Sequence, residues 1–174
     1  RLQIDFRQDS PETDETPHAN ESAEQLCQRL AIAKAHALNE KYSQHLIIGS
    51  DQVATFNGKI IGKPITHVNA VQQLTDFSGH TVAFYTGLCL LNTVTGVFQH
   101  HVECFKVDFR VLSTEQIERY LQDEQPYQCA GSFKSEGLGI CLFERLEGND
   151  PTSLIGLPLI TLVSMLKNEG IYIP

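Results

Sequence analysis

The stretch His45–Pro64, HLIIGSDQVATFNGKIIGKP, constrains the fold of this chain more than any other part of it. Leu46–Ile48 is a continuous apolar run of the kind found in interior strands, and the Asn-Gly pair between the next two apolar runs predicts a tight hairpin. We expect Asp51 at the end of the first strand and Lys63 at the exit of the hairpin, stiffened by the proline after it. The stretch therefore predicts that one sheet brings an acid and a lysine close together.

Size and charge limit what the chain can bind. Its 174 residues suit a single domain, which we expect to span residues 1–174. A formal net charge of -8 argues against a nucleic-acid partner, although a few lysines can reverse the potential in one cleft. The apolar runs are far shorter than the ~20 residues of a membrane-spanning helix, so we expect no membrane partner. Five widely spaced cysteines without a CxxC pair indicate buried, reduced thiols and a cytoplasmic location.

Hydrophobic periodicity predicts alternating helices and strands. The clearest helix is predicted from a capping-box pattern and helical apolar spacing over Ser22–Tyr42, and further helices are predicted over Thr66–Phe77, Ser113–Asp123 and Pro158–Gly170. Further strands are predicted over Arg1–Phe6, Thr81–Leu91, Val97–Leu112 and Ile140–Phe143. Several of the strands have the alternation of antiparallel strands. This order favours a mixed α/β architecture with two lobes around a cleft.

Lysines and acids lie at the predicted strand end, the hairpin exit, a helix flank and a glycine-rich loop. Besides Asp51 and Lys63, Lys34 lies on the flank of the first helix, and Lys134 and Glu136 lie in the glycine-rich loop CAGSFKSEGLG. Lysine supplies compact charge for phosphate oxygens, and a carboxylate can bind a divalent ion or deprotonate water. The residues alone fit hydrolysis of a phosphate ester or anhydride and, equally, a nucleotide-binding module without catalysis. Periodicity alone favours Lys34 as a surface lysine whose stem covers the edge of the core.

Several motifs, in order and with the right spacing, resemble the Maf family of nucleotide pyrophosphatases. They are GSDQV, a hairpin ending in IxGKP, FSG before a long strand, CAGSFKSEG, and LEGNDPTSLIGLPL. The resemblance runs from about Asp14 to Leu166. It implies an elongated mixed β-sheet flanked by helices, with a cleft between two lobes. It also implies hydrolysis of nucleoside triphosphates between the α and β phosphates, a divalent metal (Mg, Mn or Co) and a homodimer.

The resemblance also assigns residues to the reaction. Asp51 matches the proton acceptor that activates water, and Lys34 and Lys63 match residues that contact the phosphates. Glu15 matches an acidic residue of the family and would hold the metal together with Asp51. Without the resemblance, Glu15 lies in an acidic loop of the kind that is usually only solvated.

Two positions bear on the substrate. The chain has Gln52 where many Maf proteins have threonine, and Glu136 where they have glutamine. Both differences resemble the subfamily that acts on 7-methyl-GTP. The 7-methylguanine base is cationic, so Glu136 suits it by charge and by accepting from N1–H and the exocyclic amine. The expected reaction converts 7-methyl-GTP to 7-methyl-GMP and pyrophosphate. The alternatives are a dTTP or UTP pyrophosphatase of the same family and a non-catalytic, nucleotide-binding regulator of cell division.

One family element has no counterpart in this chain. Members begin with a strand and a serine- and arginine-containing loop, SxSxxR, that lines the phosphate site. No segment here matches it, and we expect this strand and loop to precede Arg1. The phosphate site within residues 1–174 is then expected to be incomplete.

Overall fold

Long antiparallel strands form the centre of the fold in the computed structural model, which describes residues 1–174. The strands are β1 (Leu46–Phe56), β2 (Lys59–Ile61), β3 (Thr81–Asn92), β4 (Phe98–Phe109) and β5 (Phe143–Glu147). They lie in the order β2-β1-β3-β4-β5. The α/β class and the flanking helices are as predicted. The sheet is antiparallel at all four pairings rather than mixed, because tight hairpins join β1 to β2 and β3 to β4 and no parallel crossover is made.

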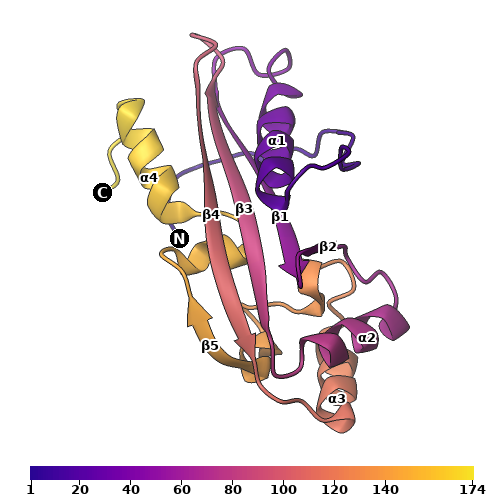
Figure 1. Ribbon diagram of the computed structural model, residues 1–174. Helices are drawn as coiled ribbons and strands as arrows, with labels where there is room; N and C mark the ends of the chain where they lie inside the picture. The colour runs from indigo at the N-terminus through magenta and orange to yellow at the C-terminus, as the bar shows by residue number, and fades with distance from the viewer.

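Helices cover both faces of the sheet. They are α1 (Ala23–His36), α2 (His67–Phe77), α3 (Thr114–Glu124) and α4 (Leu159–Asn168), with short 3-10 turns η1 (Ala130–Ser132), η2 (Leu138–Leu142) and η3 (Pro151–Ile155). Figure 1 shows α1 and α4 on opposite sides of the upper part of the long strands. Alternate residues of β3 account for this, because Cys89 packs with α1 and Leu88 packs with α4. None of the helices combines the length and the apolar character needed to cross a membrane.

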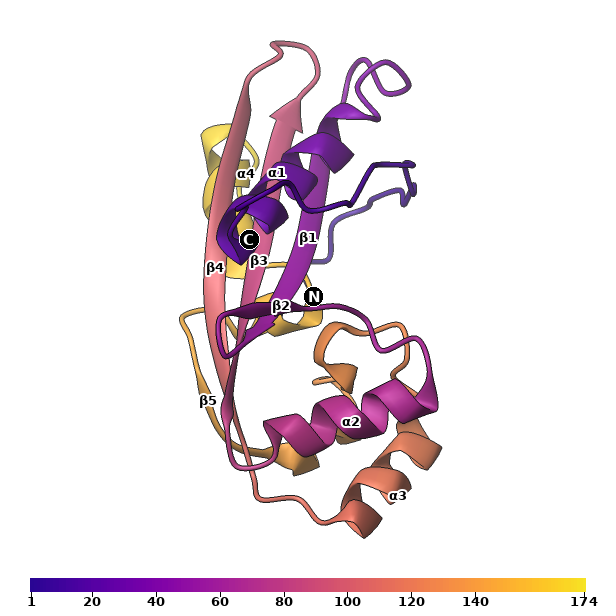
Figure 2. The same cartoon turned by 45° about the vertical axis from the view of Figure 1, so that its right-hand side comes forward.

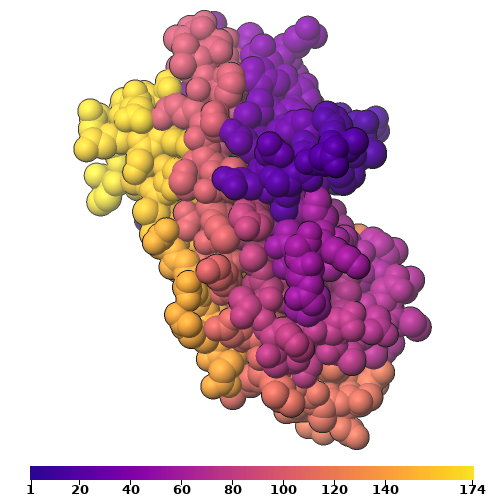
Figure 3. Space-filling view, in the orientation of Figure 1, coloured from indigo at the N-terminus to yellow at the C-terminus, as the bar shows by residue number.

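The lower ends of the strands carry the largest buried cluster. It holds 16 residues, among them six phenylalanines, and packs α2 and α3 against the sheet. Figure 2 shows α2 and α3 side by side below the long upper parts of the strands. In the space-filling view of Figure 3, the upper part carries the indigo N-terminal segment and the yellow α4, and the lower part is formed mainly by magenta and orange residues. Three smaller clusters make up the core of the upper part.

The predicted α1 and hairpin are observed with small changes in length. Ser22 forms a capping box with Gln25 at the start of α1, as predicted, but the helix ends at His36 rather than at Tyr42. The Asn-Gly turn between β1 and β2 has both residues at positive φ, as such a tight hairpin requires. All five cysteines are free, but only Cys27 and Cys89 are buried, whereas buried thiols were expected.

Two predicted strands are not formed. Arg1–Phe6 alternates as a strand would, but it pairs with no other strand, and Phe6 stays exposed. Ile140–Phe143 belongs mostly to the turn η2, and β5 begins only at its last residue. Glycines on either side of Leu138 favour a turn there over an extended strand. Alternation or a short apolar run is therefore not enough by itself to predict a strand.

The position predicted for Asp51 at the end of a strand is wrong. β1 continues through Gly49 to Phe56, so Asp51 lies in the middle of the strand. The glycine that looked like a strand end is a packing position: a Cβ at Gly49 would lie 2.2 Å from the carbonyl oxygen of Ala31 on α1. Gly49 therefore allows α1 to lie directly on the backbone of β1.

Candidate active site

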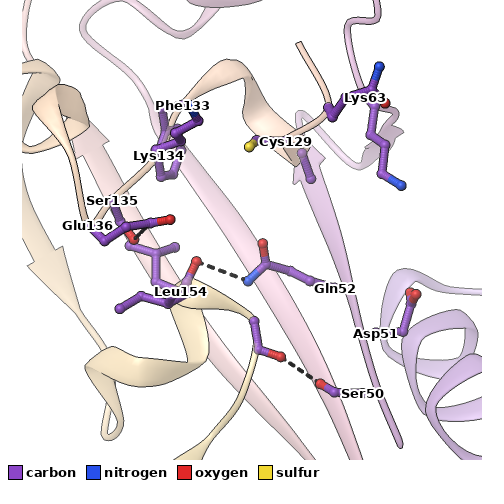
Figure 4. A pocket seen from close by; sticks show the side chains of 14 residues that line it. Ser50, Asp51, Gln52, Lys63, Cys129, Phe133, Lys134, Ser135, Glu136 and Leu154 are labelled. Atoms are coloured by element: carbon purple, nitrogen blue, oxygen red, sulfur yellow. Dashed lines mark hydrogen bonds between the residues drawn. The ribbon is translucent and has the colours of Figure 1, made fainter. Parts of the chain in front are cut away.

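A pocket of about 300 Å³ lies where β1 forms the edge of the sheet. β2 pairs with β1 only at its far end, over Ala54–Phe56, so the preceding residues of β1 have a partner on one side only. The pocket is lined by residues 50–52 of β1, Lys63 after β2, parts of the 128–136 loop, and residues 154–156 (Figure 4). This volume is at the lower end of the range of small-molecule sites. The pocket therefore joins segments that are far apart in the sequence.

Successive residues of β1 reach this pocket from opposite faces of the sheet. Asp51 bonds to Lys34 of α1 on one face, and Gln52 bonds to the backbone of Ser153 in η3 on the other. Side chains of a strand alternate between faces, so a pocket that spans the free edge can use both. Asp51 and Gln52, which were singled out separately in the sequence, thus serve one pocket.

Three charged side chains form a chain beside the pocket. Lys34 Nζ lies 2.6 Å from Asp51 Oδ1 and 2.7 Å from Glu15 Oε1. The side chain of Asp51 is only 12% exposed and that of Lys34 23% exposed, whereas Glu15 is half exposed. Charge-assisted hydrogen bonds of this length are the strong ones in proteins. Lys34 is therefore not the surface lysine that its helical periodicity favoured.

Close packing of α1 on the sheet brings Lys34 within reach of Asp51. α1 crosses β3 at Gly87, where a Cβ would lie 2.3 Å from the carbonyl oxygen of Cys27, and crosses β1 at Gly49 in the same way. No side chain lies between helix and sheet at these two points. Lys34 lies between Ala31 and Ala35, the residues of α1 that contact Gly49, and from there it reaches Asp51. The two glycines thus set the distance between the lysine and the acid.

The pKa values of Asp51, Glu15 and Lys34 are shifted in different directions, and these shifts bear on proton transfer. Burial raises the pKa of Asp51, and the hydrogen bond from Lys34 offsets only part of that effect. The hydrogen bond from Lys34 lowers the pKa of Glu15. Burial lowers the pKa of Lys34, but its hydrogen bonds to Asp51 and Glu15 outweigh burial, and the net pKa is raised. Asp51 is therefore the more basic carboxylate of the two, next to a lysine that stays charged.

Lys63 lies on the pocket wall without a salt-bridge partner (Figure 4). Side chains of α2 fix the backbone on both sides of it: Gln73 Nε2 donates to Gly62 O at 3.0 Å, and Asn69 Nδ2 donates to Pro64 O at 2.9 Å. The positive charge of Lys63 acts on Asp51 and helps to lower its pKa. A held, unpaired ammonium at a pocket wall can receive an anionic ligand.

Gln52 and Glu136 line the same pocket, as their joint assignment to the substrate requires. Gln52 Nε2 donates to Ser153 O at 2.8 Å, and Glu136 is exposed at the far wall (Figure 4). Lys134 has a different role from the one its loop suggested, because its Nζ donates to Glu124 O at the end of α3 and so ties the loop down.

The two carboxylates expected to hold a metal, Glu15 and Asp51, are joined by Lys34. No group of three or more His, Cys, Asp or Glu side chains is arranged as a metal site. Magnesium in phosphate-processing sites usually takes only one or two carboxylates, together with phosphate oxygens and water. The pair therefore fits such an ion in donor type, and Lys34 competes with the ion for both carboxylates.

Sequence reasoning missed the contribution of η3 to the pocket. The motif LEGNDPTSLIGLPL supports the resemblance but indicates no role for Leu154, Ile155 or Gly156, which line the pocket. Figure 4 shows Leu154 across the cavity from Lys63. Asp150 caps η3 through Thr152 N at 2.9 Å and also accepts from Ile160 N in α4 at 2.7 Å. The Asp-Pro-Thr pattern was the available signal, since it is typical of a helix start.

The chain matches one known protein family. A family model described as "Maf-like protein" matches residues 1–169. The match covers every residue of the pocket and all three members of the charged chain.

Proposed function

The chain belongs to the Maf-like protein family, whose members are generally nucleoside triphosphate pyrophosphatases, and on that premise we propose that it hydrolyses 7-methyl-GTP to 7-methyl-GMP and pyrophosphate. The observation that carries the reaction class is the buried Asp51, with its raised pKa, bonded to Lys34 at the edge of a pocket that also holds Lys63. A carboxylate with a perturbed pKa in a pocket is a candidate functional group, and the two lysines offer positive charge to phosphate oxygens.

Asp51 acts as general base in the proposed reaction. Its carboxylate takes a proton from water as the water oxygen forms a bond to phosphorus, and the anhydride bond between the α and β phosphates breaks to release pyrophosphate. The raised pKa of Asp51 brings the carboxylate closer to the operating pH, which favours proton transfer. Lys34 and Lys63 neutralise phosphate charge. A divalent cation held by Glu15 and Asp51 would supply further stabilisation of the leaving group.

The choice of 7-methyl-GTP is supported by two residues of the pocket. Glu136 offers a carboxylate to a base that carries a positive charge, and Gln52 lies in the same cavity. A uracil or thymine base is uncharged and has no pair of adjacent N–H donors for a carboxylate. Hydrolysis of UTP or dTTP is the alternative within the same reaction class.

A substrate panel tests the proposal directly. The purified protein is incubated with 7-methyl-GTP, GTP, UTP or dTTP and with magnesium, manganese or cobalt, and release of pyrophosphate and monophosphate is measured. We expect the highest kcat/KM with 7-methyl-GTP and no turnover after the metal is chelated. Faster hydrolysis of UTP or dTTP would contradict the substrate while leaving the reaction class intact. Tight binding without product from any nucleotide would support the non-catalytic alternative instead.

Replacement of the general base tests the mechanism. Asp51→Asn is expected to lower kcat by about 100-fold or more, the usual contribution of a general base, with the melting temperature maintained. Asp9→Asn is the matched control, because Asp9 also pairs with a lysine at 2.6 Å but lies outside the pocket. Unchanged turnover in Asp51→Asn would remove Asp51 from the proposed role.

A further inference from the structure

The side-chain amide of Gln52 is held in one orientation. Its Nε2 lies 2.8 Å from Ser153 O and 3.3 Å from Leu154 O. A backbone carbonyl oxygen can only accept a hydrogen bond, so the amide end that faces these two oxygens is the NH2 group. Oε1 then points away from them, and Figure 4 shows it directed into the pocket. The two carbonyl oxygens of η3 therefore favour the orientation of Gln52 in which a ligand meets Oε1.

Thr86 on β3 completes this arrangement. It lies opposite Gln52 in the β1–β3 register and is fully buried. Its hydroxyl donates to Ser153 O at 3.0 Å and accepts from Gln52 Nε2 at 3.1 Å. Three acceptors thus surround an amide group that has two hydrogens, and no amide hydrogen is left for a ligand.

We propose that Thr86 is a positioning residue for base recognition: its buried hydroxyl holds Gln52 so that the pocket presents a carbonyl acceptor, and not a donor, to the base. The inference rests on the proposed nucleotide pyrophosphatase function and adds to it how the base is chosen. The hydroxyl bridges the proposed recognition side chain and the backbone of η3.

The arrangement identifies a class of substrate. Gln52 Oε1 and the Glu136 carboxylate are both acceptors in one pocket. A guanine-type base carries N1–H and an exocyclic amine side by side, which are two adjacent donors. Uracil and thymine carry a single N–H between two carbonyl oxygens, and these oxygens would face acceptors. The substrate is therefore a nucleotide with adjacent N–H donors on its base, and Glu136 rather than Gln52 senses the charge added by 7-methylation.

Variants of Thr86 test the inference. Thr86→Val keeps the shape of the side chain and removes the hydroxyl, whereas Thr86→Ser keeps the hydroxyl. For each we measure the ratio of kcat/KM for 7-methyl-GTP to kcat/KM for UTP, together with the melting temperature. We expect Thr86→Val to lower this ratio about tenfold, because the hydrogen bond that Gln52 Nε2 donates to the Thr86 hydroxyl is lost. Thr86→Ser should retain the ratio. In a Gln52→Leu background, Thr86→Val should change the ratio by less than about twofold, because Thr86 acts through Gln52.

The outcomes distinguish a positioning role of Thr86 from a purely structural one. They also distinguish failure of the inference from failure of the proposed function. A purely structural Thr86 would lower activity on both nucleotides in equal proportion, and an unchanged ratio in Thr86→Val overturns the inference. If Thr86→Val does not fold, Thr86→Ala is the second hydroxyl-free variant, judged by the same ratio. If the unmodified protein releases no pyrophosphate from any nucleotide, the proposed function fails. The inference is then judged by the same ratio of dissociation constants measured by calorimetry, and an unchanged ratio again overturns it.

Discussion

Removing the charge of Lys34 should move the pH dependence of the reaction. In Lys34→Met the stem of the side chain is kept and the ammonium 2.6 Å from Asp51 Oδ1 is lost. Burial, which raises the pKa of Asp51, is then no longer opposed by a hydrogen bond from Lys34, and the nearby Glu15 carboxylate raises it further. The acid limb of the profile of kcat/KM against pH reports the protonation of the general base in the free enzyme. This limb is therefore expected at higher pH in the variant.

The size of the shift follows from the geometry of the pair. A hydrogen bond to a charged group contributes about 1.5–3 kcal/mol in proteins, and one pKa unit corresponds to about 1.4 kcal/mol. Asp51 is largely buried and Lys34 mostly so, which limits screening by solvent, although Lys34 is shared with Glu15. We therefore expect the acid limb to move up by about one to two pH units. At pH values below the new limb, turnover falls accordingly.

Two measurements check this shift. The first is the pH profile of kcat/KM, and the second is a carbon NMR titration of the Asp51 carboxyl, which does not depend on turnover. Lys41→Met is the matched control: Lys41 pairs with Asp9 at the same 2.6 Å distance, but its side chain is 63% exposed and lies outside the pocket. The control should leave the limb in place. An acid limb that stays in place or moves down in Lys34→Met refutes the coupling of Lys34 to the base.

Two further predictions concern the packing that supports the site. Hydrogen bonds from Arg29 lower the pKa of Glu21 to about 2 from 4.5, so the folded state binds fewer protons than the unfolded state between these values and loses stability as pH falls through them. Glu21→Gln should reduce the loss of stability between pH 4.5 and 2 in urea titrations, and an unchanged pH dependence would contradict this. Gly87→Ala places a Cβ 2.3 Å from Cys27 O and should lower the melting temperature by about 2–10 °C, whereas Gly62→Ala, which has open space around it, should change it little; equal effects would contradict the packing argument.

The hairpin and the pocket residues could be predicted because their signals are local. The Asn-Gly turn fixes where β1 returns, and that return places Lys63. The capping box at Ser22 fixes where α1 begins. The assignments to Gln52 and Glu136 came from a resemblance of motifs, and the fold brings both residues to one cavity. Short-range geometry and ordered motifs thus singled out Asp51, Gln52, Lys63 and Glu136, which line one pocket.

What could not be predicted depends on packing between distant segments. Lys34 lies next to the apolar stripe of α1, and only the direct contact of α1 with the sheet at Gly49 and Gly87 decides that it points at Asp51. Gly49 lacks a side chain, and in the sequence this indicates a strand end. In the fold, the same lack of a side chain allows α1 to contact β1 directly. The buried bridge from Thr86 to Gln52 joins two strands and η3, and no spacing within one segment encodes it.

Under the proposed function, the free edge of β1 lets one short motif serve two tasks, proton transfer and base recognition. Asp51 faces α1 and its charge depends on Lys34, whereas Gln52 faces η3 and its orientation depends on Thr86. The β1 backbone separates these two networks, and no hydrogen bond or salt bridge joins one to the other. Effects of changes in separate networks usually add. Loss of Lys34 should therefore move the acid limb without altering the choice of base, and loss of the Thr86 hydroxyl should alter the choice of base without moving the limb. If a single network ran through the pocket, each change would alter both the acid limb and the choice of base. Two independent effects are therefore what a site built from both faces of a sheet edge predicts.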